Sequence, residues 1–591
     1  MIILGISITH DGTLTVLKDG VNIFSIAEER LNRTKAYIGF PFLALKYVVE
    51  NEIINPKEID EVAIPSSVFL KDWAFTYAFE LTENKKYYDL QNKKKPKDFF
   101  IDDDKYLNIK SDLDCKKYVD TKIKHLLKEV GITAPINYVD HHLAHAGSAY
   151  YSSGYNNALA ITMDAAGDLL SATINICKNG KIERISKTDN NNSAGYLYSE
   201  VTRACGFKIS RHEGKITGLA AYGDYTKKED CFNKIVKVKD GRLAYVNPVK
   251  RNFRNRIVNK FLNVIGIERY MGASELIRRC GKQSKEDLSA SIQHLLEKKL
   301  VEIVTYWVKR TGERNIVLAG GIFANVKFNQ FISEIDELDN LYIFPDMGDG
   351  GNGYGAAAIS YFKKNKFVPE ISKTFNAYYG PEFDDIYIEN MLKNFTDDVE
   401  YYFSDRVEEE TAKILADNKI VGWFQGRMEY GPRALGNRSI IASPTDVTIN
   451  QWLNERMKRN EFMPFAPSCL YEYADELFEI PKESMKFPAQ FMTITFKMKN
   501  KWSNLAPAVS HVDQTARPQL VSKEANPRYH KLLTAYNKIT GLPLFINTSF
   551  NVHEEPIVCK PEEGLKSLQK GVIDYFVCGN YIIQKKKNNH K

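Results

Sequence analysis

Two segments of the chain repeat one pattern, and this repeat restricts the fold more than any other feature of the sequence. Residues 2–26 and 158–185 each read as an apolar strand, a polar loop with glycine, a second strand, a tight turn and a third strand. The turns are Asp19-Gly20 and Asn179-Gly180, and such dipeptides between strand-like runs are strong hairpin signals. The repeat therefore predicts a duplicated α/β fold with a cleft between its halves.

The polar loop of each repeated unit carries acidic residues. It is His10-Asp11-Gly12 in the first unit and residues 164–168, beginning with Asp164, in the second. Paired acidic loops that face a nucleotide are typical of actin-like (ASKHA), sugar-kinase-like ATPases, and the repeat resembles their layout. The alternative is that two hairpins with acidic turns arose independently.

The length, net charge, apolar runs and cysteine content of the chain limit the class of protein. A chain of 591 residues exceeds a single hydrophobic core, so two or more domains are expected. The 81 basic and 74 acidic residues leave a net charge of +7, which gives no sign of a nucleic-acid-binding face. No apolar run has the roughly 18 residues of a membrane span. The eight cysteines form no CxxC pair, which argues against a zinc ribbon or a disulfide framework and favours the reducing cytoplasm.

Two glycine-rich segments in the middle of the chain favour nucleotide binding. Gly320 and Gly321 follow an apolar strand and precede Asn325, and a glycine pair there lets the backbone approach a ligand closely. A second cluster, residues 348–355, runs into a helix of small residues, which suits a phosphate at a helix N-terminus. It lacks the Lys-Ser/Thr of a P-loop, so a Walker-type NTPase is disfavoured.

A histidine pair predicts a metal site. If residues 140–150 are helical, His141 and His145 are one turn apart on one face and can hold one metal ion, whereas His142 points elsewhere. Asp349, in the second glycine-rich loop, is the candidate third ligand. Nitrogen and carboxylate ligands suit Fe(II), Zn(II) or Mn(II), and the sequence does not choose among them. The alternative is a polar helix start with surface histidines.

Arginines gather in the C-terminal part, after about residue 370. Arg427, Arg433 and Arg438 fall within twelve residues and alternate with glycine, and Arg459 and Arg517 are candidates to join them. Clustered guanidinium groups suit forked contacts to phosphate oxygens. Structural salt bridges are the alternative for any one of them.

A polar loop follows an apolar strand near the C-terminal end. Asn547, Ser549 and Asn551 come directly after that strand. Their neutral polar groups suit the orientation of a nucleotide, and serve equally well as turn formers.

Taken together, the motifs resemble the carbamoyltransferases of the NodU/CmcH type, which carbamoylate nodulation factors, cephalosporin-type antibiotics and aminoglycosides. The similar stretches cover nearly the whole chain. They include His10-Asp11, Glu28-Glu29-Arg30, residues 141–146, residues 213–223, Gly320-Gly321, residues 431–440, residues 464–468 and residues 547–551.

The resemblance implies two domains. Residues 1–370 are expected to form the actin-like domain, similar to the threonylcarbamoyl-transferring subunit of tRNA modification and bearing the metal site. Residues 371–591 are expected to form an α/β domain that makes carbamoyl-adenylate. One departure concerns a Lys-x-Arg-Glu motif of the family. Arg459 matches its arginine, but the neighbouring positions are altered or shifted, so the role of Lys458 stays open.

The resemblance also implies a reaction. Carbamoyl phosphate and ATP, with Mg, are expected to give carbamoyl-adenylate in the C-terminal domain. A metal on His141, His145 and Asp349, taken as Fe(II) or else zinc or manganese, then polarises this intermediate in the N-terminal cleft. His10 is the first candidate for the base that accepts the acceptor's proton, and Lys215 and Asp164 are expected in the same cleft.

Several alternatives stay open. The acceptor is expected to be a hydroxyl-bearing small molecule such as a sugar, an aminoglycoside, a polyketide or a glycan. No membrane or nucleic-acid partner is expected, and a homodimer is one option for the assembly. The main alternative function is an actin-like-fold small-molecule kinase, which makes ADP instead of AMP and pyrophosphate. A tRNA-modifying protein and a non-catalytic nucleotide-binding regulator are further alternatives.

Overall fold

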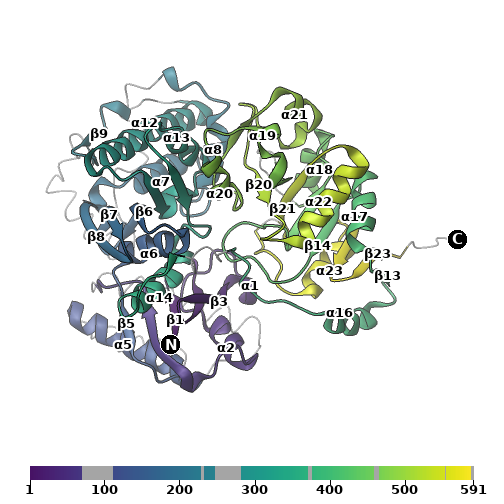
Figure 1. Cartoon of the computed structure of the whole chain (residues 1–591), viewed down its shortest axis with the longest axis horizontal. Helices are drawn as coiled ribbons and strands as arrows, with labels where there is room; N and C mark the ends of the chain where they lie inside the picture. Colours follow the sequence, from purple (N-terminus) through teal and green to yellow (C-terminus); the bar gives the residue numbers. More distant parts are fainter. Residues whose placement is uncertain are drawn as a thin grey trace.

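The structure is a computed structural model of the chain. It describes residues 1–8, 10–69, 111–227, 232–245, 281, 283–369, 376–457, 465–552 and 554–586. Three groups of elements are visible in Figure 1: two stacked lobes built from the first part of the chain, in purple to teal, and a third beside them built from the C-terminal part, in green to yellow.

The first lobe is a five-stranded sheet with the order β3-β2-β1-β4-β5. Its strands are β1 (Ile2–Ser7), β2 (Thr13–Lys18), β3 (Val21–Ala27), β4 (Ile59–Ile64) and β5 (Ile136–Tyr138). β1 pairs antiparallel with β2 and parallel with β4. Asp19 and Gly20 both have positive φ, 50° and 83°, which is the geometry that a two-residue hairpin turn of this kind requires. The lobe also carries α1 (Glu29–Asn32), α2 (Phe42–Glu50) and α5 (Asp112–Glu129).

The second lobe repeats this topology. Its sheet has the order β12-β11-β6-β7-β8, with β6 (Asn157–Gly167), β7 (Leu170–Lys178), β8 (Lys181–Asp189), β11 (Asn315–Ala319) and β12 (Asn340–Ile343). β6 pairs antiparallel with β7 and parallel with β11, as β1 does with β2 and β4. Asn179 and Gly180 again have positive φ. The predicted duplicated, actin-like α/β fold is therefore confirmed.

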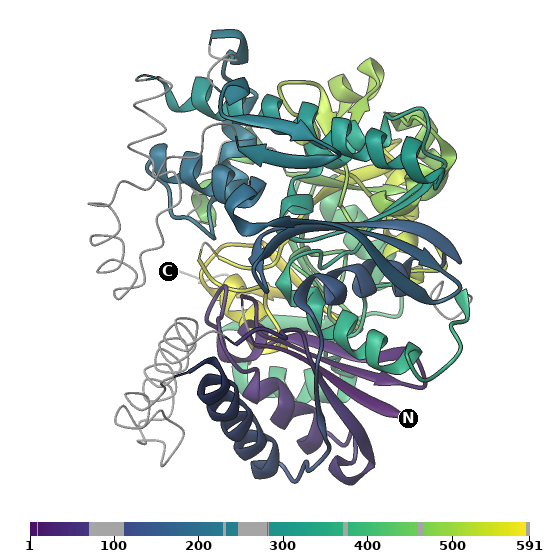
Figure 2. The same ribbon diagram turned by 90° about the vertical axis from the view of Figure 1, so that its left-hand side faces the viewer.

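Helices cover the sheet of the second lobe (Figure 2). They are α7 (Ala194–Ala204), α8 (Glu213–Ala220), α12 (Lys285–Thr311) and α13 (Val326–Ser333), and a small hairpin of β9 (Val236–Lys239) and β10 (Arg242–Tyr245) lies beside them. Ser284 is the N-cap residue of α12, and its side chain accepts a hydrogen bond from Asp287 N. The helix ends at Gly312, which has the left-handed conformation. None of the described helices is long and apolar enough to cross a membrane.

Two helices of small residues join the lobes: α6 (His141–Ser153) and α14 (Asn352–Phe362). A Cβ atom at Gly355 would lie only 1.9 Å from the carbonyl oxygen of Ala144, and one at Gly5 would lie 1.9 Å from the carbonyl oxygen of Gly353. α14 therefore packs against both α6 and β1 through bare backbone. The glycines and alanines of the second glycine-rich segment have this packing role.

The C-terminal lobe is an eight-stranded mixed sheet with the order β13-β23-β22-β14-β15-β21-β16-β20. Its strands are β13 (Val399–Phe403), β14 (Val421–Phe424), β15 (Arg438–Ala442), β16 (Ala466–Leu470), β20 (Gln519–Val521), β21 (Leu544–Ser549), β22 (Tyr575–Cys578) and β23 (Tyr581–Lys585). The helices around it include α16 (Asp385–Leu392), α17 (Val407–Ala416), α18 (Thr448–Arg456), α22 (Pro527–Thr540) and α23 (Pro561–Gln569).

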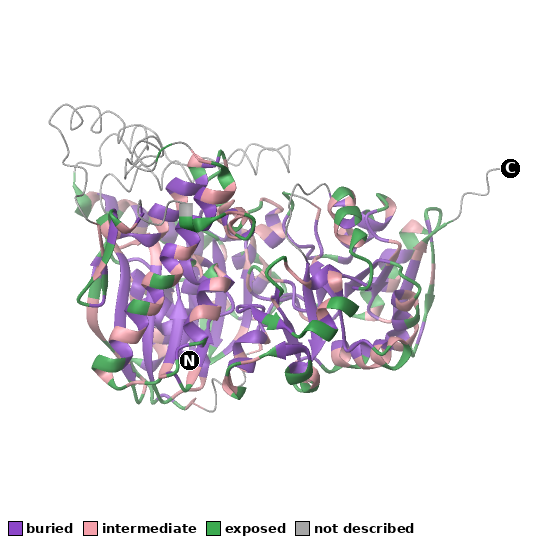
Figure 3. Cartoon of the chain, turned by 90° about the horizontal axis from the view of Figure 1, so that it is seen from above, coloured by how far each residue is buried: buried purple, intermediate pink, exposed green. Residues whose placement is uncertain are grey.

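Shorter elements complete the C-terminal lobe. They are the helices α19 (Ala474–Leu477), α20 (Lys486–Ala489) and α21 (Asn500–Leu505), and a small sheet of β17 (Phe478–Glu479), β18 (Phe496–Met498) and β19 (Thr515–Ala516). Figure 3 shows the strands of the large sheets mostly buried, and around them helices in which buried and exposed residues alternate. The predicted domain boundary at 370/371 lies outside the described residues and stays a prediction.

Candidate active site

Four side chains converge at the start of α6. His145 Nε2 lies 3.2 Å from Asp164 Oδ2 and 3.3 Å from Asp349 Oδ1, and His141 Nε2 lies 3.6 Å and 3.4 Å from the same two oxygens. All four ligand atoms lie within 4.8 Å of one another. α6 supplies the two histidines, the end of β6 supplies Asp164, and the loop before α14 supplies Asp349. The structure thus brings the predicted ligands together, and adds Asp164 as a fourth.

Glycines make room for this cluster. A Cβ atom at Gly167 would lie 2.0 Å from Cδ2 of His141, and one at Gly321 would lie 3.1 Å from Oδ1 of Asp164. Gly320 has a φ of 106°, and its Cβ would lie 2.1 Å from the carbonyl oxygen of Met163. Gly320 and Gly321 therefore let the end of β11 pack directly against the strand that carries Asp164.

The chemistry of the four donors fits a transition metal. Burial alone would raise the pKa of Asp349, but the charges of the two histidines outweigh it and hold that pKa well below its usual value. His141 Nε2 is buried and has no hydrogen-bond partner among the described residues. Two imidazole nitrogens with two ionised carboxylates suit Fe(II), Mn(II) or Zn(II).

His142 takes no part in the cluster, as the helical spacing predicts. Its Nδ1 lies 2.8 Å from Thr162 Oγ1, and its Nε2 lies 3.1 Å from the carbonyl oxygen of Leu170. Burial, reinforced by the neighbouring histidines, lowers its pKa to about 3. His142 is thus a neutral side chain that connects α6 to the hairpin β6–β7 through hydrogen bonds.

The loop between β1 and β2 places His10 and Asp11 near this cluster. His10 is exposed. Asp11 has a φ of 55°, and desolvation, followed by the charge of Glu29, raises its pKa to about 6. Asp346 was not expected here. It is 8% exposed, and burial, followed by the charge of Asp11, raises its pKa well above its usual value.

A cavity of about 310 Å³ lies between the second lobe and the C-terminal lobe. Seven of the predicted site residues line it: Lys215, Asn325, Arg433, Arg517, Asn547, Ser549 and Asn551. Lys215 belongs to α8, Asn325 caps α13, and the others come from loops and the strand β21 of the C-terminal sheet. Residues that are more than three hundred positions apart in the sequence therefore meet in one cavity.

The cavity is strongly cationic. Lys35, Arg211, Lys215, Arg433 and Arg517 line it, and its described lining contains no Asp or Glu. Burial lowers the pKa of Arg433 to about 10, and burial together with the charge of Arg433 lowers the pKa of Arg517. Neither of these two guanidinium groups forms an ion pair with a described residue, and the Nε atom of each is buried without a partner. An anionic ligand would relieve this uncompensated charge.

The other predicted arginines lie elsewhere. Arg427 donates hydrogen bonds to the carbonyl oxygens of Ile23 and Tyr379. Arg438 is fully buried, donates to the carbonyl oxygens of Gln425, Gly426 and Pro381, and stacks on Phe424 at 3.6 Å. The structure does not bring either of them to the cavity, because the backbone already occupies their donors. Arg459 and Lys458 lie outside the described residues.

A second cavity, of about 440 Å³, adjoins the cationic cavity and shares Thr217, Val326, Phe465, Ala466 and Arg517 with it. Alanine, valine and phenylalanine side chains form much of its wall.

Polar groups lie in the wall of this second cavity. Glu297 accepts a hydrogen bond from Gln293 Nε2 at 2.8 Å. Lys327 and Asp513 form a 2.8 Å ion pair that joins α13 to the C-terminal lobe.

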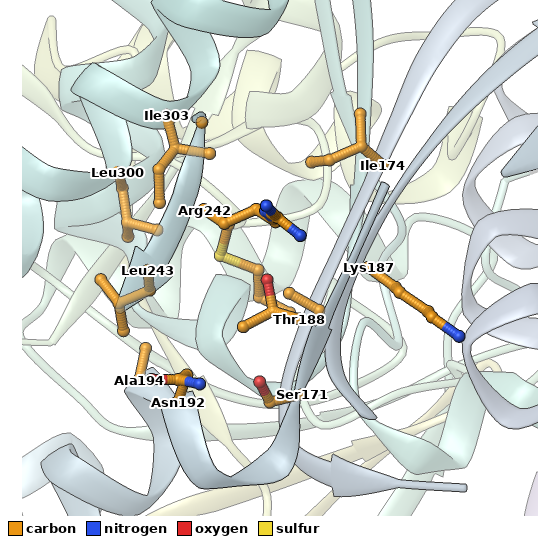
Figure 4. A pocket seen from close by; sticks show the side chains of 13 residues that line it. Ser171, Ile174, Lys187, Thr188, Asn192, Ala194, Arg242, Leu243, Leu300 and Ile303 are labelled. Carbon is orange, nitrogen blue, oxygen red and sulfur yellow. The ribbon is translucent and has the colours of Figure 1, made fainter. Parts of the chain in front are cut away.

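A third cavity, in Figure 4, lies between β7, β8 and α12. Leu243, Leu300 and Ile303 point into it, whereas Lys187 extends away. Its volume of about 20 Å³ suffices for a single water molecule, so it is too small for a substrate.

One turn of chain connects the metal cluster to the cationic cavity. The short helix η4 (Gly321–Ala324) begins beside Asp164, and its last residue, Ala324, lines the cavity together with Asn325. A 3₁₀ helix rises about 2 Å per residue, so the two sites are on the order of 10 Å apart. Arg433 Nη2 reaches the carbonyl oxygen of Ala324 at 3.5 Å.

Two family models and several relatives match most of the chain. A family model described as "Carbamoyltransferase N-terminus" matches residues 2–358, and one described as "Carbamoyltransferase C-terminus" matches residues 412–585. Nodulation protein NolNO of Sinorhizobium fredii is 31% identical over 98% of this chain and 79% of its own length. An uncharacterized protein of Synechocystis sp. is 31% identical over 99% of this chain and 96% of its own. The crystal structure of full-length HypF in the phosphate- and nucleotide-bound form covers 61% of this chain and 46% of its own, at 16% identity and a TM-score of 0.29.

Proposed function

The chain belongs to the carbamoyltransferase family, and we propose that it activates a carbamoyl group with ATP and transfers it to a hydroxyl of a small-molecule or sugar acceptor. The observation that carries this proposal is the cationic cavity, which ends about one helical turn from a cluster of four metal-ligating side chains. The first site suits activation of the carbamoyl group, and the second suits its transfer.

The cationic cavity suits two phosphorylated substrates. ATP and carbamoyl phosphate together carry four or more negative charges, which must be neutralised before a nucleophile can approach phosphorus. Five basic side chains without a carboxylate in the described lining provide such an environment. The adjoining cavity, with its apolar wall and its few polar groups, suits the adenosine end of the nucleotide.

Activation takes place in two stages. Carbamoyl phosphate and water give carbamate and phosphate. A carbamate oxygen then attacks the α-phosphorus of ATP, the bond to the β-phosphate oxygen breaks, and the products are carbamoyl-adenylate and pyrophosphate. Arg433 and Arg517, placed side by side in the cavity, hold the phosphate oxygens on which charge develops.

The transfer step forms a bond between the acceptor oxygen and the carbamoyl carbon, and AMP leaves. A metal held by His141, His145, Asp164 and Asp349 supplies Lewis-acid polarisation of the carbamoyl group when bound. His10 accepts the hydroxyl proton, and its neighbour Asp11 is the alternative base. Both residues are in the loop between β1 and β2, where Asp11 interacts electrostatically with Asp349.

The buried thiols support a cytoplasmic location. The six cysteines in the described part of the chain are buried free thiols, which suits a reducing cytoplasm. Fe(II), Mg with the ATP and a homodimeric assembly stay predictions.

Product analysis tests the function. The protein is incubated with Fe(II), Mg, ATP, carbamoyl phosphate and a panel of hydroxyl-bearing acceptors. Mass spectrometry should show the gain of one carbamoyl unit on an acceptor, with AMP and pyrophosphate as nucleotide products. Arg517→Ala should lose pyrophosphate formation, because it removes one of the two buried guanidinium groups that line the cavity.

A matched control is Arg314→Ala. Arg314 is half exposed and pairs with Asp339 away from both sites, so pyrophosphate formation should persist. Production of ADP with phosphorylation of the acceptor would overturn the proposal in favour of a kinase. Unchanged pyrophosphate formation in Arg517→Ala would show that activation takes place outside this cavity.

A further inference from the structure

Asn352 is the first residue of α14, and its side chain adjoins the metal cluster. It follows Asp349 by three positions and is 0% exposed. Its Nδ2 lies 3.2 Å from His145 Nε2. The Asn352 amide therefore contacts the same ring nitrogen that faces the carboxylates of Asp164 and Asp349.

The distances around His145 Nε2 match the spacing of ligands on one metal ion. Donor atoms that each lie about 2.1 Å from a metal are about 3.0 Å apart at a right angle and about 3.4 Å apart at the tetrahedral angle. Asp164 Oδ2 and Asp349 Oδ1 lie 3.2 Å and 3.3 Å from this nitrogen, and the Asn352 amide nitrogen lies 3.2 Å from it. The terminal amide of Asn352 thus has the spacing of a further ligand.

The amide also lies on the side of the imidazole ring where a metal binds. The contact between Asn352 Nδ2 and His145 Nε2 has hydrogen-bond geometry, and such a contact extends outward from the ring, along the lone pair of the nitrogen. A metal ion uses the same lone pair. Asp164 Oδ2 meets this nitrogen with hydrogen-bond geometry as well, so the amide and this carboxylate lie on the same side of the ring.

Metal binding would change which end of the Asn352 amide belongs at the cluster. Once His145 Nε2 binds a metal, its lone pair is no longer an acceptor for Asn352 Nδ2. Asn352 Oδ1 is meanwhile buried without a hydrogen-bond partner among the described residues. A half turn of the terminal amide exchanges nitrogen and oxygen, and it places at the cluster the amide atom that can bind a metal.

We propose that Asn352 Oδ1 is a fifth protein ligand of the metal ion, and that this ligand shifts the preference of the site from Zn(II) toward six-coordinate Fe(II) or Mn(II). The inference rests on the proposed function, since it takes the four-residue cluster as the metal site. Two imidazole nitrogens, two carboxylate oxygens and one amide oxygen fill five positions. The sixth position stays open for the group that is transferred.

Coordination number and charge are the physical basis of this preference. Zn(II) in proteins usually has four ligands, of which a catalytic site supplies three and leaves one position open, so a fifth protein ligand adds little to its binding. Nitrogen and oxygen donors in higher coordination numbers suit Fe(II) and Mn(II). The carboxylates of Asp164 and Asp349 already neutralise a divalent ion. The neutral amide therefore adds a donor atom without making the site anionic.

Metal binding in the absence of substrates tests the inference, because this measurement does not depend on turnover. Co(II) reports its coordination number through its visible absorption, which is much stronger in a tetrahedral site than in a six-coordinate site. The Co(II)-loaded wild-type protein should show the weak bands of six-coordination. Intense tetrahedral bands would overturn the inference, whether or not any variant folds.

Two variants of Asn352 show whether its oxygen binds the metal. Asn352→Leu removes the oxygen at similar side-chain size. It should weaken Fe(II) binding at least about tenfold in chelator competition, and it should weaken Zn(II) binding less, because Zn(II) needs fewer ligands. Asn352→Asp keeps an oxygen in the same place and adds a negative charge, so it should bind Fe(II) at least as tightly as the wild type.

Asn175→Leu is the matched control. Asn175 is also 0% exposed, and its Oδ1 is likewise buried without a partner among the described residues. It lies in β7, and its Nδ2 donates to the carbonyl oxygen of Ala160 and to Thr173 Oγ1 instead of contacting a metal ligand. Its replacement should leave the affinities for Fe(II) and Zn(II) unchanged.

The outcomes separate the inference from the function on which it rests. Unchanged Fe(II) affinity in folded Asn352→Leu would overturn the role of Asn352 and leave the four-residue site intact. A loss in Asn352→Asp as large as that in Asn352→Leu would do the same, and equal losses of Fe(II) and Zn(II) would overturn the preference. A wild-type protein that binds none of these metals would instead overturn the metal site, and with it the transfer step of the proposed function.

Discussion

Glu297 lies on α12 in the wall of the second cavity, and its contribution to the free energy of unfolding depends on pH in a way that can be calculated. Its side chain is 11% exposed. Burial raises its pKa from 4.5 to about 7, although a hydrogen bond from Gln293 opposes this. Between these two pH values the folded protein holds a proton that the unfolded chain has released. The free energy of unfolding therefore falls as pH rises through this window.

The magnitude follows from the two pKa values. Each tenfold change in proton affinity is worth about 1.4 kcal/mol, so the raised pKa costs the folded protein about 3 kcal/mol above pH 7. The cost is absent below about pH 4.5, where both states are protonated. Glu297→Gln removes the titrating group but keeps an oxygen that accepts from Gln293. It should therefore stabilise the protein at pH 8 relative to pH 5.

Thermal unfolding of wild-type and variant protein at pH 5 and pH 8 checks this. For a domain of about 370 residues, an unfolding entropy of about 2 cal/mol/K per residue converts 3 kcal/mol into about 4 °C. The variant's Tm should exceed that of the wild type by about this amount at pH 8, and the difference should shrink toward pH 5. Glu302→Gln, on the same helix with its side chain half exposed, is the control and should show little pH-dependent difference. The reasoning is refuted if Glu297→Gln gives the same Tm difference at both pH values.

Further predictions concern the metal, the arginines and the helix contact. Asp164→Asn should lower the affinity for Fe(II) at least about tenfold by chelator competition, while carbamoyl-phosphate-dependent pyrophosphate formation persists; unchanged affinity would remove Asp164 from the ligand set. Arg433→Ala should weaken ATP binding in titration calorimetry and leave Tm nearly unchanged. Arg438→Ala should instead lower Tm, because the Arg438 side chain donates five hydrogen bonds to backbone carbonyls. The same effect of both arginine variants on ATP binding and on Tm would contradict this division. Gly355→Val should destabilise the protein by at least about 2 kcal/mol in urea titration, and a neutral result would show that α6 and α14 can move apart.

Some features of the site could be predicted because they depend on local spacing. The hairpin turns at Asp19-Gly20 and Asn179-Gly180 depend on dipeptides that tolerate positive φ, and the structure has positive φ at all four residues. His141 and His145 share a face because they are one helical turn apart, whatever surrounds the helix. Local rules of this kind need no knowledge of distant contacts.

Other features depend on contacts between distant segments. Asp164 faces the histidines of α6 only because the end of β6 comes to the start of that helix. Its loop was expected in the cleft, but nothing near it in the sequence marks it as a fourth ligand. Asp346 became buried beside Asp11 for the same reason, and the sequence contains no signal for it beyond its place near Asp349.

The arginines show where sequence and tertiary structure divide. The sequence by itself determined the family motifs, the duplicated α/β units and a C-terminal part with clustered guanidinium groups, because these depend on residue type, spacing and period. Only the tertiary structure decided that Arg438 donates hydrogen bonds to backbone carbonyls, whereas Arg433 and Arg517 line a cavity whose described lining contains no Asp or Glu. The physical reason is that a long side chain on a loop takes its direction from whichever acceptors the packed chain places around it.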